Sequence, residues 1–187
     1  MKILHTGIVD AIRSDFRSAR AGAVFARVFA PGAGSSVTEF IDEARSAMLE
    51  ECDYVLEAKR QETFRSLFAG DPIIAIPATV PDWCAPTVLT TEWMPGLSLD
   101  DFLAGRPAQS VRDEVGVALF RLYVGTLYRH GLFHADPHPG NYAFAKDGRL
   151  VVYDFGCVRS FDRATVAHLA GTWRLSAPTM SPPWPRV

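Results

Sequence analysis

The spacing of hydrophobic positions predicts two long helices in the first part of the chain. Between residues 8 and 29, apolar side chains recur every three or four positions and then meet the breaker run Pro-Gly-Ala-Gly at 31–34. A second helical pattern opens with Ser36 and Glu39, which have the spacing of a capping box, and continues to about residue 69. The sequence therefore predicts a helix, a loop and a longer helix with room for one break.

Two short runs rich in β-branched residues follow these helices. Residues 73–76 and 87–93 are bounded by prolines, which is typical of strands. We expect them to form one sheet that packs on the helix around Glu57. Residues 94–96, Met-Pro-Gly, predict a turn between two lobes.

The second half of the chain predicts two capped helices and a β-hairpin. Ser98 begins a short helix that ends at Gly105, and Ser110 begins a longer one that ends at His130 and Gly131. Strands are expected at 142–145 and 149–153, joined by a Lys-Asp-Gly turn. Because helices and strands are segregated along the chain, the predicted fold class is α+β.

Composition and charge exclude several functions. With 48% hydrophobic residues and a net charge of only -2, the chain is globular and lacks the basic surface of a nucleic-acid-binding protein. The three cysteines have no C-x-x-C spacing, which argues against a disulfide framework or zinc clip and favours the cytoplasm. No apolar run approaches the ~20 residues that span a bilayer. We therefore expect no membrane span, and any membrane association to be peripheral, through partners.

One loop and one strand end carry the candidate chemistry. The segment His-Ala-Asp-Pro-His-Pro-Gly-Asn at 134–141 has too many prolines for a helix or a central strand, so it must be a shaped loop. Asp-Phe-Gly at 154–156 ends an apolar strand. Asp136 can orient an acceptor, and Asn141 and Asp154 can hold magnesium, which is the set that phosphoryl transfer needs. In this order and spacing, the residues match the catalytic and metal loops of kinases.

A metal cluster is the alternative interpretation of this loop. His130, His134, Asp136 and His138 could bind zinc or iron, since alternate residues of an extended segment share one side. Asp-Phe-Gly alone is also a weak signal, because many strands end in an acid, an apolar residue and glycine.

Kinase-type sites also need a lysine on the phosphates that pairs with a helix glutamate. The chain has only three lysines, and Lys2 and the acidic second helix offer such a pair. The helix acids Glu50, Glu51, Glu57 and Glu62 could equally form a solvated face.

Four stretches resemble the UbiB/AarF family of atypical protein-kinase-like proteins, which is linked to coenzyme Q biosynthesis. They are residues 51–58 (ECDYVLEA), residues 88–96 (VLTTEWMPG), the HADPHPGN loop and DFG. The resemblance implies an incomplete protein-kinase-like two-lobe fold. A partial N lobe is expected at 1–92, a partial C lobe at 93–171, and a disordered proline-rich tail at 172–187.

The resemblance also implies roles for individual residues, with ATP and Mg²⁺ as cofactors. Lys2 would be the ATP lysine and Glu57 its helix partner, whereas Glu51 resembles a second glutamate that faces a regulatory segment. Asp136 would be the catalytic acid. The adenine-binding hinge would be Glu92, Trp93 and Met94, and the metal ligands would be Asn141 and Asp154.

The family's lysine-glycine-glutamine segment and nucleotide loop lie ahead of the ATP lysine, where this chain begins with Met1. The resemblance therefore implies an ATP-binding kinase or ATPase truncated at both ends, with weak activity or none. Its phosphoryl acceptor is unknown, and a small molecule or a lipid-pathway component is the expectation. Two alternatives stay open: a small-molecule kinase of the aminoglycoside or choline type, and a catalytically dead binding or scaffold remnant.

Overall fold

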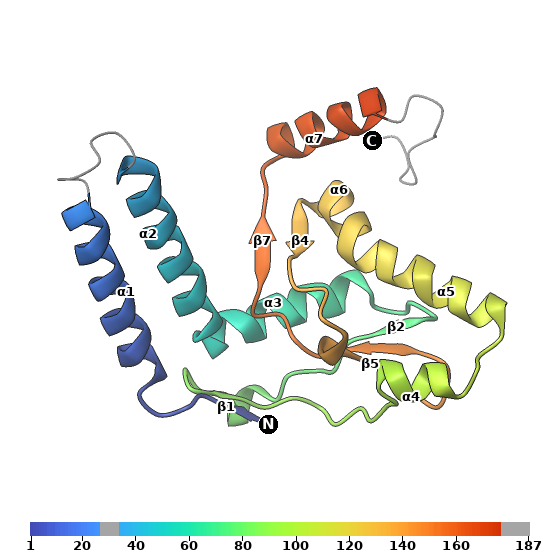
Figure 1. Cartoon of the computed structure of the whole chain (residues 1–187). Coiled ribbons are helices and arrows are strands. Elements are labelled where there is room, and N and C mark those ends of the chain that lie inside the picture. Colours follow the sequence, from blue (N-terminus) through green and yellow to red (C-terminus); the bar gives the residue numbers. More distant parts are fainter. Residues whose placement is uncertain (27–33, 177–187) are drawn as a thin grey trace.

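The computed structural model of the chain describes residues 1–26 and 34–176. Its helices and strands form a mixed α+β fold, as the sequence predicts (Figure 1). The main helices are α1 (Ile8–Ala26), α2 (Gly34–Glu51), α3 (Tyr54–Leu67), α4 (Leu99–Ala104), α5 (Gln109–Phe120), α6 (Thr126–His130) and α7 (Arg163–Ser176). The strands are β1 (Lys2–Ile3), β2 (Ile74–Ala75), β3 (Val88–Leu89), β4 (Leu132–His134), β5 (Tyr142–Phe144), β6 (Leu150–Val152) and β7 (Val158–Ser160).

Helices α1 and α2 lie side by side and project from the rest of the molecule (Figure 1). An ion pair of 2.9 Å between Arg20 and Asp42 joins them. Helix α2 begins at Gly34, ahead of the predicted cap at Ser36, and the predicted loop at 31–34 lies mostly outside the described residues. The predicted break in the long helix is confirmed by the separation of α2 from α3.

Asp53 explains that break. Its carboxylate accepts hydrogen bonds from the backbone N–H groups of Val55 (3.1 Å) and Leu56 (3.0 Å), which makes it the N-cap of α3. A capped N-terminus starts a new helix axis, since these donors have no intrahelical partner. Helix α3 can therefore point in its own direction and carry Glu57 into the interior.

The prediction that residues 73–76 and 87–93 form one sheet is wrong. Strand β2 pairs in parallel with β6 in a three-stranded sheet of order β2-β6-β5, whereas β3 pairs with β1 in antiparallel fashion. Both residues of β2 are buried, and β6 is fully buried. A strand that is apolar on both faces is stable where both faces are covered, and the interior beside β6 provides this.

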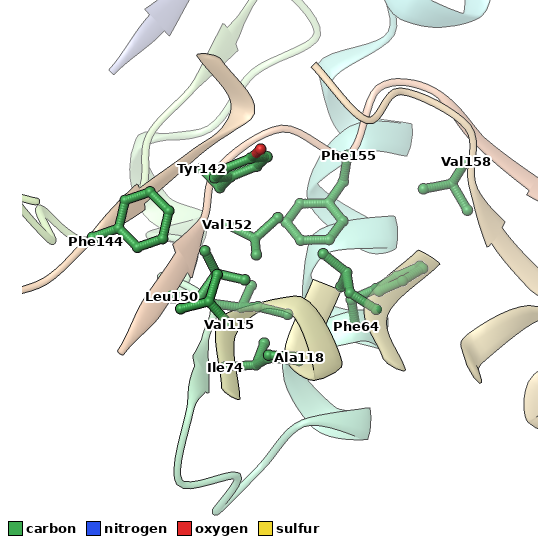
Figure 2. Packing of buried hydrophobic residues seen from close by; sticks show 12 residues of the cluster. Phe64, Ile74, Val115, Ala118, Tyr142, Phe144, Leu150, Val152, Phe155 and Val158 are labelled. Carbon is green, nitrogen blue, oxygen red and sulfur yellow. The ribbon is translucent and has the colours of Figure 1, made fainter. Parts of the chain in front are cut away.

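The core lies between this sheet, α3 and α5 (Figure 2). Its fully buried side chains include Phe64 of α3, Leu150 and Val152 of β6, and Phe155 of the Asp-Phe-Gly segment. Phe155 contacts Phe64 with a ring separation of 5.2 Å. The hydrophobic core thus holds the middle residue of the candidate metal loop in place.

The predicted helix from Ser110 to His130 is one continuous helical segment with a π-helical turn, Arg121–Gly125, between α5 and α6. Its N-cap is Ala108, so the predicted cap at Ser110 is wrong. Gly131 ends it in the left-handed conformation with a φ of 67°, as the sequence predicts.

Helix α7 continues to Ser176, so the first part of the predicted disordered tail at 172–187 is helical. The rest of that tail lies outside the described residues. Within residues 1–26 and 34–176, no helix is long and apolar enough to cross a membrane. The lobe boundary at 92/93 stays a prediction.

Candidate functional site

Lys2 joins the amino-terminal strand to two acids from distant parts of the chain. Its Nζ donates to Glu57 Oε1 and Oε2 at 3.0 and 2.9 Å, and to Asp154 Oδ2 at 3.0 Å. Strand β1 fixes the position, because Lys2 pairs with Leu89 of β3. The ammonium also lies 5.1 Å from the centre of the Tyr54 ring, a cation–π distance. One cation is therefore shared by two carboxylates.

Glu57 is on the buried side of α3. Tyr54, Glu57, Gln61 and Phe64 are the buried residues of this helix, and their spacing places them on one face. Burial raises the pKa of Glu57 and the nearby Asp154 charge raises it further, while Lys2 offsets this only in part. Burial lowers the pKa of Lys2, but its hydrogen bonds and charge interactions with the two acids outweigh this effect and raise it. Lys2 is therefore a cation at neutral pH.

The candidate catalytic loop is held by backbone and side-chain contacts. Asn141 Nδ2 donates to Asp136 Oδ2 at 2.6 Å, so the predicted catalytic acid and the predicted metal ligand touch. The backbone N–H of Tyr153 donates to the Asn141 carbonyl at 2.9 Å, and that of Ala135 donates to the Cys157 carbonyl at 2.8 Å. These contacts tie the loop to the strand that ends at Asp154.

His134 has a structural position, which contradicts the alternative metal cluster. Its Nε2 lies 2.6 Å from the carbonyl oxygen of Asp154, and its ring packs among Phe64, Tyr123 and Phe155. Burial lowers its pKa, so the ring is neutral and donates from Nε2. In the part of the chain that the structure describes, no three His, Cys, Asp or Glu residues are placed to hold a metal ion together.

Two cavities meet at Lys2 and Asp154, which line both. The smaller, of about 210 Å³, lies on the β3 side and is also lined by Leu89, Thr91 and Asn141. The larger, of about 610 Å³, lies toward the α1–α2 hairpin; its lining includes Ile8, Ile12, Met48, Glu51 and Asp136. The Lys2 ammonium and the Asp154 carboxylate are therefore accessible from both cavities.

The predicted hinge residues Glu92, Trp93 and Met94 stand apart from the lining of these two cavities. The backbone N–H of Glu92 donates to Ala78 at 2.8 Å, and the Met94 carbonyl accepts from the Tyr153 hydroxyl at 2.5 Å. The Trp93 side chain is 84% exposed. The structure brings Thr91 to the cavity instead, so a role of residues 92–94 in adenine binding stays a prediction.

The donor set beside Lys2 fits magnesium. Asn141 and Asp154 line the same cavity and offer an amide oxygen and a carboxylate, which are the hard oxygen ligands that Mg²⁺ prefers. Magnesium bound through one or two protein ligands completes its shell with water and phosphate oxygens. In the present arrangement, Asp154 Oδ1 accepts the Gly156 N–H at 2.9 Å and Oδ2 contacts Lys2.

Two contributors to the site were missed by sequence reasoning. Arg60 donates to the Gly156 carbonyl at 2.7 Å, and its position one turn after Glu57 was the available signal. The Tyr153 hydroxyl donates to the Met94 carbonyl and so links the 94–96 turn to the segment between β6 and Asp154. Nothing in the sequence pattern distinguishes this tyrosine from other strand tyrosines.

Comparison with known proteins identifies the family. The sequence model of the ABC1 atypical kinase-like domain matches residues 1–177. In Arabidopsis thaliana, the chloroplastic protein ACTIVITY OF BC1 COMPLEX KINASE 8 is 30% identical over 165 residues, which are 86% of this chain and 22% of that protein. ACTIVITY OF BC1 COMPLEX KINASE 1, also chloroplastic, is 39% identical over 132 residues, which are 67% of this chain and 18% of that protein.

A solved structure agrees with this relationship. The complex of Rv3197 with erythromycin from Mycobacterium tuberculosis superposes with a TM-score of 0.70 and 28% identity, over 96% of this chain and 46% of the other. The chain belongs to the ABC1 atypical kinase-like family, and the UbiB/AarF resemblance is confirmed. It spans about a fifth of the two plant relatives named above.

Proposed function

We propose that this chain binds ATP with magnesium and carries the catalytic half of an atypical kinase or ATPase. The observation that supports this most is the contact of Lys2 with both Glu57 and Asp154. In kinase-type sites the lysine that contacts phosphate pairs with a helix glutamate, and an Asp-Phe-Gly aspartate holds the metal. Here the candidate lysine contacts the candidates for both other roles.

The two cavities suggest how the substrates are arranged. We place the nucleotide base toward the smaller cavity, beside Leu89 and Thr91, with its phosphates at Lys2. Magnesium, when bound through Asn141 and Asp154, would neutralise phosphate charge. Asp136 lines the larger cavity and would orient the acceptor hydroxyl or accept its proton.

The acceptor proposal follows from the same cavity wall. Ile8, Ile12 and Met48 supply apolar surface beside Asp136, so an acceptor with an apolar body and a hydroxyl group fits better than a polar peptide. A small molecule or a lipid-pathway component, including one of ubiquinone biosynthesis, has this character. The cytoplasmic location is likewise a proposal, since the two plant relatives are named chloroplastic.

Equilibrium binding of ATP to the purified chain, with magnesium and then with a chelator, tests this function. We expect weak binding that requires the metal, because Lys2 alone offers one positive charge to several phosphate charges. Hydrolysis or transfer is expected to be slow and to be lost in Asp136→Asn. An Asp136→Asn variant that keeps the turnover of the parent chain would contradict the catalytic role of this residue.

A further inference from the structure

Arg60 contacts the candidate metal loop, residues 154–156, at a different residue from Lys2. Its side chain is only 17% exposed. Nη1 donates to the carbonyl oxygen of Gly156 at 2.7 Å, and Nη2 donates to Glu50 Oε2 at 2.9 Å. A planar guanidinium fixes both directions at once, since its donors are in a rigid fork. The position of the Gly156 carbonyl is therefore set by a group that is itself held in place.

Two side chains of helix α3 act on the loop of residues 154–156. Arg60 donates to the carbonyl of Gly156, and the pKa of Glu57, which burial and Asp154 raise, is lowered by the backbone N–H of Phe155. Glu57 and Arg60 are one turn apart on the same helix, so their backbone positions are fixed relative to each other. The loop that carries Asp154 therefore lies against the Glu57 carboxylate and the Arg60 guanidinium, which both belong to helix α3.

Glu50 connects Arg60 to the pair of helices α1 and α2, called here the α1–α2 hairpin. It is near the end of α2, and its Oε2 accepts from Arg60 and also from Arg159 Nη1 of β7, at 3.1 Å. The carboxylate therefore joins α2, α3 and β7 at one point. Helix α2 packs along α1, and both helices line the larger cavity. A shift of these two helices would therefore move Glu50, which orients Arg60.

We propose that Arg60 is a positioning residue for the metal loop, and that the α1–α2 hairpin acts on the loop through Glu50. A ligand in the larger cavity, which α1 and α2 help to form, would then change the position of Asp154. The link to nucleotide binding rests on the function proposed above, whereas the effect on the loop itself does not.

Two variants separate positioning from simple support of the fold. Arg60→Met removes both donors and keeps an unbranched apolar stem. Glu50→Gln keeps the shape and removes the charge, and it serves if Arg60→Met folds poorly. Arg65→Met is the matched control, because Arg65 is on the same helix, is 47% exposed and pairs with Glu62 at 2.6 Å, away from the loop.

Hydrogen exchange of the backbone amides at 155–157 is the first measurement. We expect exchange about tenfold faster in Arg60→Met, and a smaller increase in Glu50→Gln, because a charge-assisted hydrogen bond is lost or weakened. Amides of β5 and β6 should exchange at the parent rate, and Arg65→Met should leave the loop unchanged. Equal acceleration throughout the core would show that Arg60 only supports the fold, and would overturn the proposal.

The second measurement is the ATP dissociation constant in the presence of magnesium. Arg60→Met should raise this constant by about tenfold, because the metal loop is displaced, and Arg65→Met should leave it at the parent value. If the parent chain binds no ATP, the proposed function fails, but the exchange result still decides the role of Arg60. An unchanged loop in both Arg60→Met and Glu50→Gln would overturn the positioning role whatever the ATP result.

Discussion

Lys2 Nζ lies 3.0 Å from Asp154 Oδ2, so the amino-terminal strand touches the loop proposed to bind the metal. In this state the ammonium neutralises the carboxylate that magnesium would otherwise occupy. Glu57, which is only 1% exposed, competes for the same cation. The charge state of this group of three residues should therefore influence both stability and metal binding.

Replacing Lys2 with methionine should destabilise the protein in a pH-dependent way. The buried Glu57 loses its cation, and the cost at neutral pH should be about 1–3 kcal/mol. Because burial and Asp154 raise the pKa of Glu57 above its ordinary value of 4.5, the carboxyl binds its proton more tightly in the folded state. The loss should therefore be small below pH 4.5 and grow as pH rises through the folded-state pKa.

Chemical denaturation of Lys2→Met at several pH values checks this. The control is Lys146→Met, which removes an exposed lysine in the β5–β6 turn. A Lys2→Met penalty that is the same at pH 4 and pH 8, or no larger than that of Lys146→Met, would show that the ammonium does not stabilise buried Glu57.

We expect His134 to give a pH dependence of stability opposite in sign to that of Glu57. Burial lowers its pKa below 6.5, so the unfolded state binds a proton that the folded state excludes. Stability should then fall as pH decreases from 6.5 toward the folded-state pKa, by up to about 1.4 kcal/mol per pH unit. His134→Gln keeps a donor for the Asp154 carbonyl but cannot titrate, so this slope should disappear. Thermal melts from pH 7.5 to 5 measure it.

The matched variant for this series is His5→Gln, because His5 is exposed. It should retain the slope of the parent chain. A slope that persists in His134→Gln would mean that other groups cause it and that the buried ring is not the source.

Gly96 is required by a close approach between chain segments. A Cβ at this position would lie 2.9 Å from Ala143 Cβ and 2.9 Å from the carbonyl carbon of Phe144. The approach exists because Leu97 and Phe144 exchange backbone hydrogen bonds of 2.8 and 2.9 Å. We expect Gly96→Ala to destabilise the fold by about 1–3 kcal/mol, since the backbone must move.

Gly116→Ala is the control for that experiment. Gly116 is in α5, and an added Cβ there would meet nothing within 4 Å. Alanine should stabilise this helix by roughly 0.5–1 kcal/mol. Equal unfolding free energies for the two variants would contradict the close packing of the 94–96 turn on β5.

The sequence predicted best the features that local physics decides. The end of α6 at Gly131 and the β5–β6 hairpin depend on a cap and a turn, which are visible in a few neighbouring residues. A break in the long helix was allowed for, but its position at Asp53 was not predicted. The proximity of Asp136 and Asn141 followed from their separation within one proline-rich loop. Resemblance, not pattern, supplied the pairing of Lys2 with Glu57.

The pairing of strands that are distant in the sequence could not be predicted. The short strands β2 and β3 each had several acceptable partners, and burial beside β6 decided between them only in the assembled core. The role of Arg60 depends on the Gly156 carbonyl, which is distant in sequence. The position of Arg60 one turn after Glu57 was the only local signal, and that signal is weak because a basic residue on a helix usually faces solvent.

Magnesium-dependent ATP binding by the parent chain and by Asp154→Ala tests the central claim most directly. Asp147→Ala is the control, since Asp147 is an exposed acid in the nearby turn. Titration calorimetry of the three proteins, with magnesium and with chelator, should show metal-dependent binding in the parent and in Asp147→Ala and none in Asp154→Ala, because the carboxylate that positions the metal is gone. ATP binding that is unaffected by the chelator or by Asp154→Ala would contradict the account and show that other residues form the nucleotide site.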